Sequence, residues 1–337
     1  IVCIGTISDI VPLVDENRVI TKLGLKLVEV TKNIGLKELI TASGYNKIDS
    51  TMISFGIAPR INACGRMGYE QEALKLFLTN DKQEAKEITE KLNNYNKERQ
   101  TIEKQIFEEA VSKVENEKNQ PCIILGDEKW HHGVIGIVSS KITDLYFKPS
   151  ILICFEDDIG KGSGRSIPGF DLHEALGKCS NFLEKYGGHE MAVGVTLKKE
   201  NFLNFKKEFE EVVRNSKLEE LVPIIYIDEQ IDLKDISIDI VKELSLLEPF
   251  GEANKMPVFI FKNLKINSIR SLSEGKHLKL TLKDEHLIVN AIGFNLGYLA
   301  EEYLIGDKID IAGTLEINSF NGMDSIQINI KDIRKTY

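Results

Sequence analysis

Leu278-Lys-Leu-Thr-Leu-Lys283 is the stretch of this sequence that says most about its fold. Its three leucines alternate with Lys279, Thr281 and Lys283, and side chains two residues apart lie on the same face of a β-strand. The stretch therefore predicts a strand with an apolar face toward a core and a basic face toward solvent. An ordinary solvated face is the alternative interpretation of the basic side.

Further alternating segments surround this strand and make the region from Ile224 onward rich in β-structure. Together with 278–282, the expected strands cover 258–269, 287–294, 308–317 and 325–330. Turn residues such as Ser319-Phe-Asn-Gly322 separate them, and one helix is expected near 296–303. Five short strands and one helix predict a small closed β-barrel of the OB type, a fold that binds single-stranded nucleic acids.

The predicted barrel is locally basic although the whole chain is acidic. The net charge of the 337 residues is −9, which argues mildly against a nucleic-acid ligand. Between Lys255 and Lys283, however, seven Lys and Arg residues accompany a single acid, Glu274. Segregated charge of this kind is the electrostatic footprint of nucleic-acid binding. The candidates for phosphate contact here are Lys262, Lys265, Lys279 and Lys283.

An α/β domain is expected upstream of the barrel. Expected strands at 121–126, 150–155 and 191–197 alternate with expected helices at 134–146, 172–186 and 201–214. This alternation is typical of a sheet covered by helices. A long helix over 81–117, capped by Asn80 or Asp81, would connect this domain to the N-terminal region. The alternative is a two-helix hairpin broken at Asn93-Asn94.

The first 78 residues are expected to mix short strands with helices. Ile1–Ile7 is an apolar run that predicts a buried parallel strand, and two helices should follow near 21–31 and 35–42. Open α/β sheets carry ligand groups at the carboxyl ends of their strands, so Asp9 would be presented to a hard cation. A turn or N-cap aspartate is the plainer interpretation.

Composition is typical of a soluble globular protein of two or three domains, with 42% hydrophobic residues. No apolar run reaches the roughly 18 residues that a membrane span needs. Five scattered cysteines without a Cys-x-x-Cys pair fit a reducing cytosol and give no zinc site or disulfide framework. The start lacks Met, a basic segment and a cleavage site, which indicates the interior of a longer protein.

Two motifs combine basic side chains with glycine. Pro59-Arg-Ile-Asn-Ala-Cys-Gly-Arg66 supplies two guanidinium groups, which suit bidentate phosphate contact, although surface arginines beside a turn are an equal alternative. Trp130-His-His-Gly133 should lie between a strand and a helix. Consecutive residues rarely bind the same ion, so a helix-capping or substrate-facing role is favoured over a metal site for His131.

Two glycine-rich motifs follow in the α/β domain. Gly162-Ser-Gly-Arg-Ser166 offers side-chain donors, and its consecutive N–H groups could form an anion nest, with a plain glycine turn as the alternative. Tyr186-Gly-Gly-His-Glu-Met-Ala-Val-Gly194 is expected to join a helix to a strand and to present His189 at an edge. A lone histidine is more often a satisfied structural residue.

In their order along the chain, six segments resemble the RecJ family of the DHH phosphoesterase superfamily, over essentially the whole sequence. They are GTISDIVPL (5–13), PRINACGRMG (59–68), WHHGVIGIVSSKI (130–142), GSGRSIPGFDL (162–172), GGHEMAVG (187–194) and EPFGEANKMPVF (248–259). The last separates RecJ from smaller relatives that cleave short oligonucleotides or cyclic dinucleotides. The implied domains are the remainder of a DHH catalytic domain (1–78), a connector helix (79–120), a DHH-associated GGH substrate-binding domain (121–218) and an OB-fold domain that binds single-stranded DNA (219–337).

The resemblance also implies a set of site residues. The family binds two divalent ions, Mn²⁺ or Mg²⁺, and Asp9 matches the last of the metal-binding carboxylates. Ser163 and Arg165 match residues that grip the 5′-phosphate end, and His189 matches the catalytic histidine that faces the scissile phosphate. The candidate phosphate-binding residues of this region are Arg60, Asn62, Arg66, His131, Ser163, Arg165, Gly187, Gly188 and His189. The Asp-His-His motif of the family is absent, because His131-His132 follow Trp130, and the remaining metal ligands would lie upstream of Ile1.

The activity that the resemblance implies is stepwise 5′→3′ hydrolysis of single-stranded DNA in recombination and repair. Single-stranded DNA would be the substrate, and a single-strand-binding protein or a helicase the protein partner, for a cytoplasmic monomer without membrane contact. This chain alone is expected to be inactive. Two other functions stay open: a non-catalytic single-strand-binding scaffold, and a nanoRNA or cyclic-dinucleotide phosphodiesterase.

Overall fold

The computed structural model of the chain describes residues 1–116, 120–216, 218, 221–285, 287–320 and 322–336. It divides into two compact units. The first contains Ile1–Val30, Lys47–Ser54 and Ile224–Tyr337, and the second contains Thr31–Asn46 and Phe55–Pro223. Within the described residues, no helix combines the length and the apolarity needed to cross a membrane.

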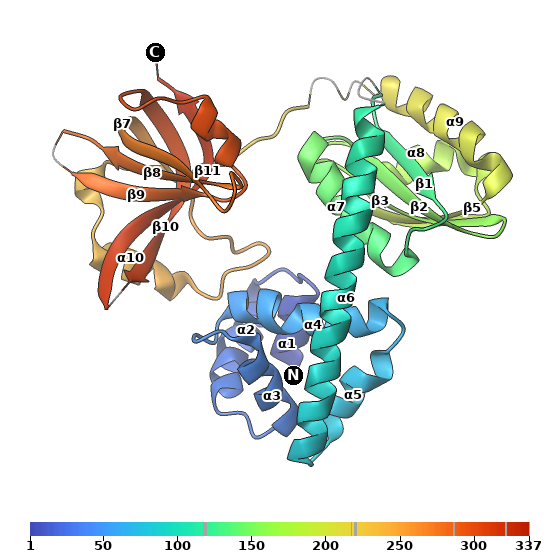
Figure 1. Ribbon diagram of the computed structural model, residues 1–337, viewed down its shortest axis with the longest axis horizontal. Helices are drawn as coiled ribbons and strands as arrows, with labels where there is room; N and C mark the ends of the chain where they lie inside the picture. Colours follow the sequence, from blue (N-terminus) through green and yellow to red (C-terminus); the bar gives the residue numbers. More distant parts are fainter. Residues whose placement is uncertain (117–119, 217, 219–220, 286, 321, 337) are drawn as a thin grey trace. The chain divides into compact units, whose positions relative to one another are not determined.

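A single 34-residue helix, α6 (Lys82–Glu115), is the central element of the second unit (Figure 1). The side chain of Asp81 caps it by accepting hydrogen bonds from the N–H groups of Gln83 and Glu84. At 1.5 Å per residue the helix is about 51 Å long. The predicted long helix is therefore confirmed, and the hairpin alternative is wrong. Three shorter helices pack against it: α3 (Ile34–Ser43), α4 (Ala58–Arg66) and α5 (Glu70–Leu78).

The α/β domain of this unit is a five-stranded sheet with strand order β1-β2-β3-β5-β4. β1 and β2 are parallel, and the other neighbours are antiparallel. The strands are β1 (Ile123–Asp127), β2 (Ser150–Glu156), β3 (Ile159–Arg165), β4 (Lys185–His189) and β5 (Ala192–Lys198). The helices are α7 (His132–Tyr146), α8 (Leu172–Lys178) and α9 (Phe202–Arg214), with 3-10 turns η2 (Ser180–Phe182) and η3 (Lys199–Asn201).

Two apolar clusters cover the two faces of this sheet. On one face, α6 and α7 pack over β1 and β2, with Trp130, Val138 and Leu152 among the buried residues. On the other face, α8 and α9 pack over the strands through residues such as Leu172 and Phe205. On the first face α7 packs on β2 and β3, whereas β4 and β5 are contacted by α8, which lies on the other face.

The sequence predicted the glycine-rich parts of this domain wrongly. Residues 162–165 belong to strand β3, which is paired on both sides, so their N–H groups are part of the ladders and form no anion nest. Both glycines are required by packing, because a Cβ at Gly162 or Gly164 would lie 2.6–2.7 Å from a valine of β5. The helix expected over 172–186 ends at Lys178, and Gly187-Gly188 belong to strand β4. Strand pairing overrides the poor β-propensity of glycine.

The N-terminal strand prediction is also wrong. Residues 2–8 form helix α1 (Val2–Ser8), which packs on α2 (Asp15–Glu29). The buried residues of α1 are Cys3, Ile4 and Ile7, a helical spacing, and a Cβ at Gly24 of α2 would overlap the Cys3 side chain. A short apolar run cannot be assigned to strand or helix from its pattern. A further helical segment, η1 (Met52–Ile57), is a π-helix, and residues 1–78 contain no strand.

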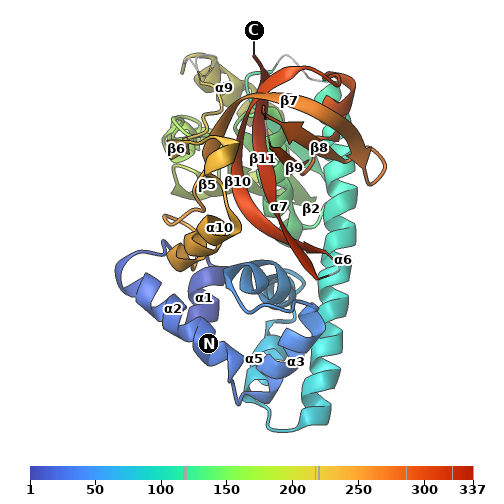
Figure 2. The same ribbon diagram turned by 90° about the vertical axis from the view of Figure 1, so that its left-hand side faces the viewer.

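A five-stranded closed barrel forms most of the first unit, as expected (Figure 2). Its strands are β7 (Phe259–Leu272), β8 (His277–Lys283), β9 (Ile288–Gly293), β10 (Lys308–Phe320) and β11 (Met323–Lys335). β10 closes the barrel by pairing with both β11 and β7. The expected helix at 296–303 is only the 3-10 helix η7 (Gly297–Glu301). The short elements before the barrel are β6 (Glu229–Gln230), η5 (Leu233–Asp235), α10 (Ile238–Leu244) and η6 (Ser245–Leu247).

The segment that precedes β7 packs against the N-terminal helices of the same unit. The N–H of Leu13 donates to the carbonyl oxygen of Glu252 at 2.7 Å, and Arg18 Nη2 donates to the carbonyl oxygen of Leu247 at 2.7 Å. Lys47 Nζ lies 2.8 Å from Glu248 Oε1. The motif at 248–259 therefore joins the barrel to residues that are distant in the sequence.

Candidate nucleic-acid interface

The open part of the α/β sheet brings several predicted residues onto one face. Arg165 of β3 pairs with Ala192 of β5, which pairs with His189 of β4. In the next row, Ser163 pairs with Gly194, which pairs with Gly187. Directly paired residues of antiparallel strands project to the same face of the sheet. Arg165, Ser163 and His189 therefore share a face, with Ala192 between Arg165 and His189 and with Gly194 and Gly187 beside Ser163.

Gly194 and Gly187 form a floor of bare backbone in the row next to Ser163. A Cβ placed on Gly187 or on Gly194 would have no heavy atom within 4 Å, so the space above both residues is open. Gly188 differs, because its φ is +138° and a Cβ there would overlap the carbonyl oxygen of Ala192. Gly188 is thus required by the hairpin itself, whereas Gly187 and Gly194 leave room for a ligand to approach the main chain.

Ser163 and Arg165 are held in place at one side of this floor. Arg165 Nη1 donates to Ser163 Oγ at 3.0 Å and to the carbonyl oxygen of Gly164 at 2.8 Å. Helix α7 lies against them, because a Cβ at Gly136 would be 2.9 Å from Ser163 Oγ. Among the described residues, the other two guanidinium nitrogens of Arg165 have no acceptor. They are donors in a fixed position for an anion.

Arg66 lies beside Arg165 and increases the positive charge of this site. Burial lowers the pKa of Arg165, and the charge of Arg66 lowers it further. Arg66 Nη1 donates to the carbonyl oxygen of Gly133 at 3.1 Å, at the start of α7. A Cβ at Gly133 would overlap the carbonyl oxygen of Arg66, so only glycine lets the end of α4 approach α7 this closely. Two partly buried guanidinium groups without an intervening carboxylate are typical of a phosphate site.

A buried carboxylate on α6 lies close to these cations, and the sequence analysis did not identify it. Glu103 is 6% exposed and accepts ion pairs from Arg99 and from Lys141 of α7. Arg99 Nη2 also donates to Asn96 Oδ1 at 2.6 Å. Burial lowers the pKa of Arg66, Arg99 lowers it further and Glu103 raises it, so all three charges are close. Three cations, Arg99, Lys141 and Arg66, therefore share one carboxylate, which leaves net positive charge for a ligand.

His131 caps helix α7, in agreement with the capping alternative of its motif. Its Nδ1 accepts a hydrogen bond of 3.1 Å from the N–H of Gly133, which leaves the proton of a neutral ring on Nε2. Burial lowers the pKa of His131, and neighbouring His132 lowers it further. The two rings stack with their centroids 5.3 Å apart. His132 Nδ1 lies 3.4 Å from Glu156 Oε1, on the exposed surface.

His189 is exposed at the end of edge strand β4. Its Nδ1 accepts a hydrogen bond of 3.3 Å from the N–H of Met191 in the hairpin turn. Two backbone bonds fix that turn: the N–H of Ser166 donates to Met191 O at 3.0 Å, and the N–H of Leu172 donates to Glu190 O at 3.0 Å. The imidazole is therefore presented to solvent from a rigid support.

Arg60 and Asn62 of α4 differ in what surrounds them. Arg60 Nε donates to Asn93 Oδ1 at 2.6 Å, and its other two nitrogens donate to the carbonyl oxygens of Gly56 and Ala42. These bonds join α4 to α3 and α6, which favours a structural role for Arg60. Asn62 is exposed and makes no side-chain hydrogen bond within the described part of the chain.

Asp9 follows helix α1 rather than a strand, and it is exposed. Its N–H donates to the carbonyl oxygen of Gly5 at 3.0 Å. Across the described ranges, no three His, Cys, Asp or Glu side chains are close enough together to hold a metal ion. Asp9 by itself therefore does not make a divalent-ion site among the described residues, because such an ion is held by several oxygen ligands together.

The outer face of the barrel carries the predicted basic residues in register. Leu278, Leu280 and Leu282 of β8 are fully buried, which confirms the alternation predicted for this strand. Across the strands, Lys279 pairs with Arg270 of β7, and Lys283 pairs with Lys265 of β7. Lys265 also pairs with Lys308 of β10, so three lysines form one row across the barrel.

This arrangement of lysines is unfavourable without an anion. Like charges that face each other across strands destabilise a sheet. Within the part of the chain that the structure describes, none of Lys265, Lys279, Lys283 and Lys308 makes an ion pair. Lys262 is exposed on β7, three residues before Lys265, and no strand residue pairs directly with it. The row therefore favours a polyanion as the ligand of this face.

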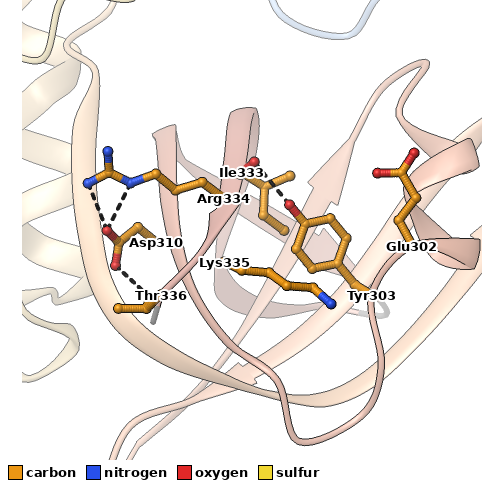
Figure 3. Close-up of a pocket in the computed structure, with 7 residues that line it drawn as sticks. All are labelled: Glu302, Tyr303, Asp310, Ile333, Arg334, Lys335 and Thr336. Atoms are coloured by element: carbon orange, nitrogen blue, oxygen red, sulfur yellow. Dashed lines mark hydrogen bonds and ion pairs between the residues drawn. The ribbon is translucent and has the colours of Figure 1, made fainter.

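A concavity near the end of the barrel has mutually satisfied polar groups and offers little to a ligand (Figure 3). Asp310 accepts hydrogen bonds from Arg334 Nε at 3.1 Å, from Thr336 Oγ1 at 3.0 Å and from the N–H of Asn263 at 3.1 Å. Burial would raise the pKa of Asp310, but these hydrogen bonds lower it overall. Lys335 lies over the ring of Tyr303, whose hydroxyl donates to Ile333 O. We interpret this network as part of the barrel framework.

Comparison with known families gives two matches along the chain. The DHHA1 domain matches residues 110–215, and the RecJ OB domain matches residues 227–332. The chain is 37% identical over 336 residues to the single-stranded-DNA-specific exonuclease RecJ of Bacillus subtilis, covering 98% of this chain and 43% of that protein. It is 33% identical over 339 residues to the enzyme of the same description from Thermus thermophilus, covering 98% and 47%.

Solved structures agree with these sequence matches. The structure of RecJ in complex with Mn²⁺ from Thermus thermophilus matches with a TM-score of 0.88 at 32% identity, over 99% of this chain and 49% of that chain. RecJ in complex with Mg²⁺ from the same organism matches with a TM-score of 0.87 at 31% identity, over 99% and 52%. The chain thus spans about half the length of the relatives it matches.

Proposed function

We propose that the protein containing this chain is a single-stranded-DNA-specific exonuclease, because the chain belongs to the RecJ family and corresponds to its DHHA1 and OB domains. Its action would be stepwise hydrolysis in the 5′→3′ direction, in recombination and repair. The observation that carries the proposal is the shared sheet face on which Arg165, Ser163 and His189 flank an open glycine floor.

The 5′-phosphate is the group that we assign to Ser163, Arg165 and Arg66. A terminal phosphate carries more charge than an internal one, and the two guanidinium groups supply charge-assisted donors next to the Ser163 hydroxyl. The strand would continue across Gly187 and Gly194 toward His189, whose exposed imidazole would face a phosphodiester of the substrate. His131 would contribute through the helix start that it caps, and Asn62 through its exposed amide.

The barrel is the part that we assign to the remainder of the strand. The row of Lys308, Lys265 and Lys283 and the pair of Arg270 and Lys279 would contact phosphates. Contacts to phosphates position a nucleic acid without recognising its sequence. This matches an enzyme that degrades single strands of any sequence.

Divalent ions are proposed for the whole protein, in line with the Mn²⁺ and Mg²⁺ complexes of the Thermus proteins. Asp9 is proposed as one ligand among several. The described residues of this chain do not complete such a site. For this reason we expect the 337 residues on their own to bind single-stranded DNA without degrading it, as a scaffold would.

The cellular setting follows from the resemblance to RecJ alone. We propose that the whole protein is a cytoplasmic monomer that works with a single-strand-binding protein or a helicase. A phosphodiesterase for nanoRNA or cyclic dinucleotides is disfavoured by the RecJ OB domain at 227–332.

The decisive assay uses the whole protein with Mn²⁺ and long single-stranded DNA labelled at the 5′ end. Early release of labelled mononucleotide, with duplex DNA and dinucleotides degraded far more slowly, is the expected result. Faster turnover of dinucleotides would favour the phosphodiesterase. Binding of long single strands without any hydrolysis would favour the scaffold.

A further inference from the structure

An exposed aromatic ring stands at one end of the basic face of the barrel. Phe294, the residue after strand β9, is 52% exposed although it is a large apolar side chain. Its ring contacts the ring of His277 edge to face, with centroids 5.3 Å apart and planes inclined at 75°. His277 is the first residue of β8, the strand that carries Lys279 and Lys283.

The strand register puts this ring pair in line with the cations. Leu278 pairs with Gly293 and points into the barrel, whereas Lys279 pairs with Ile292 on the outer face. His277 lies two residues before Lys279 and therefore on the same outer face. Because Phe294 contacts His277, the aromatic pair continues the row of outer-face residues on β8 and β9 by one step.

The surrounding backbone holds the pair rigidly. His277 Nδ1 accepts a hydrogen bond of 3.1 Å from the N–H of Asn295, and the N–H of Gly297 donates to Lys276 O at 3.2 Å. A Cβ at Gly297 would overlap the carbonyl oxygen of Gly275, so η7 packs directly on the turn between β7 and β8. An exposed ring on a rigid support loses little conformational entropy when a flat ligand stacks on it.

We propose that Phe294, braced by His277, is a stacking platform for a nucleobase of a single strand whose phosphates contact Lys279 and Arg270. Charge complementarity favours this occupant, because Lys279 follows His277 on the same face of β8, Arg270 pairs with Lys279, and Glu274 is the single acid between Lys255 and Lys283. Aromatic side chains beside cations are how OB folds bind single strands, through the faces that all bases share. The inference rests on the proposed role of the barrel in binding single-stranded DNA.

The test compares two strands with equal charge and different bases. The 337-residue chain is titrated with a fluorescent oligothymidylate of about 20 nucleotides, longer than the roughly 4–16 that one OB fold covers. The second strand has the same length and phosphates but abasic residues. We expect Phe294→Ala to bind oligothymidylate about ten-fold more weakly, to bind the abasic strand as the unaltered chain does, and to keep the salt dependence.

A second variant gives a spectroscopic signature of stacking. Phe294→Trp should keep the affinity, and its indole fluorescence should be quenched by oligothymidylate but not by the abasic strand. Trp130, the single tryptophan of the chain, is buried and supplies a constant background. Tyr298→Ala is the control, because Tyr298 is also an exposed aromatic residue but belongs to η7, and its removal should change neither affinity.

The outcomes separate this inference from the function on which it rests. If the unaltered chain binds oligothymidylate and Phe294→Ala binds it equally well, the stacking platform is wrong and the basic face stands. The same holds if Phe294→Trp binds without quenching. If the unaltered chain binds neither strand, the proposed role of the barrel fails and the platform with it.

Discussion

Ser163 Oγ accepts a hydrogen bond of 3.0 Å from Arg165 Nη1, on the open face of the sheet. The bond orients the guanidinium group, and helix α7 prevents both side chains from turning away. A terminal phosphate at this place would meet donors that are already fixed before it binds. Pre-organised donors of this kind increase affinity because less conformational freedom is lost on binding.

Removal of the Arg165 side chain tests the proposed 5′-phosphate site directly. In the whole protein, Arg165→Ala should erase most of the preference for 5′-phosphate over 5′-hydroxyl ends, because a charge-assisted hydrogen bond contributes roughly 1.5–3 kcal/mol. The ratio of kcat/KM for the two ends is the measurement. Lys161→Ala is the matched control, since Lys161 lies on the same strand but pairs with Glu156. An unchanged ratio in Arg165→Ala would contradict the assignment.

The two neighbouring glycines of β4 should respond differently to alanine. Gly188→Ala should lower the free energy of unfolding by at least about 1 kcal/mol, because the methyl overlaps Ala192 O at a positive φ. Gly187→Ala should leave stability nearly unchanged but weaken binding of a short 5′-phosphorylated oligonucleotide on the order of ten-fold, or roughly 1.4 kcal/mol. Urea unfolding and titration give the two quantities. Equal binding by Gly187→Ala and the unaltered chain would rule out the glycine floor.

Glu103 should be important for stability because its carboxylate is buried between two cations. Glu103→Gln leaves Arg99 and Lys141 without their partner, a change that costs about 3 kcal/mol for a buried pair. Trp130 reports on this region, since its Nε1 donates to Glu109 of the same helix at 2.9 Å. Glu108→Gln is the control on α6: its pair with Lys104 is exposed, so the effect should stay within about 0.5 kcal/mol. Similar urea midpoints for the two variants would show that Glu103 is not a structural centre.

The basic face of the barrel should bind with a strong salt dependence. Changing Lys279 and Lys283 together to Glu should weaken binding of a long single strand and flatten the plot of log K against log salt, by roughly 0.7 per lost phosphate contact. Changing Lys242 and Lys331 to Glu alters the charge equally, on exposed positions away from β8, and should keep the slope. If affinity and slope survive the first double change, the barrel face has another role.

The pH dependence of stability should contain a contribution from His131. Burial and His132 lower its pKa in the folded protein, so the neutral form stabilises the fold. That contribution is complete above the ordinary histidine pKa of about 6.5 and is lost as the pH falls from there through the lowered value. His131→Asn keeps an N-cap acceptor but does not titrate, so unfolding followed between pH 7 and pH 5, about the range where histidine titrates, should show a shallower loss of stability. An identical pH profile in the variant would contradict this cause.

Strong periodicity made the largest elements predictable. The buried leucines of β8 and the 34-residue helix α6 follow directly from their spacing. Ile1–Ile7 was predicted wrongly because a short, mostly apolar run fits a buried strand and a buried helix equally well. Strand β3 was missed because its glycines are required by close packing against the valines of β5. The local sequence contains no information about that packing. The domain bounds stay a prediction.

The candidate site was predictable only where a short motif contains it. Ser163, Arg165 and His189 came from such motifs, although the resemblance did not indicate that β5 separates them. The pair of Arg99 and Glu103 was missed, because four-residue spacing of opposite charges also describes the exposed pair of Lys104 and Glu108 on the same helix. Phe294 and His277 are 17 residues apart, and only the strand register brings their rings together.

The bare floor at Gly187 and Gly194 has a consequence for selectivity. Discrimination among the four bases requires side-chain donors and acceptors aimed at base edges. Gly187 and Gly194 have no side chain to aim at a base edge, and two adjacent positions without side chains cannot favour a purine over a pyrimidine by shape. A strand lying there would slide past one nucleotide at a time with an even energy profile, so no sequence would arrest it.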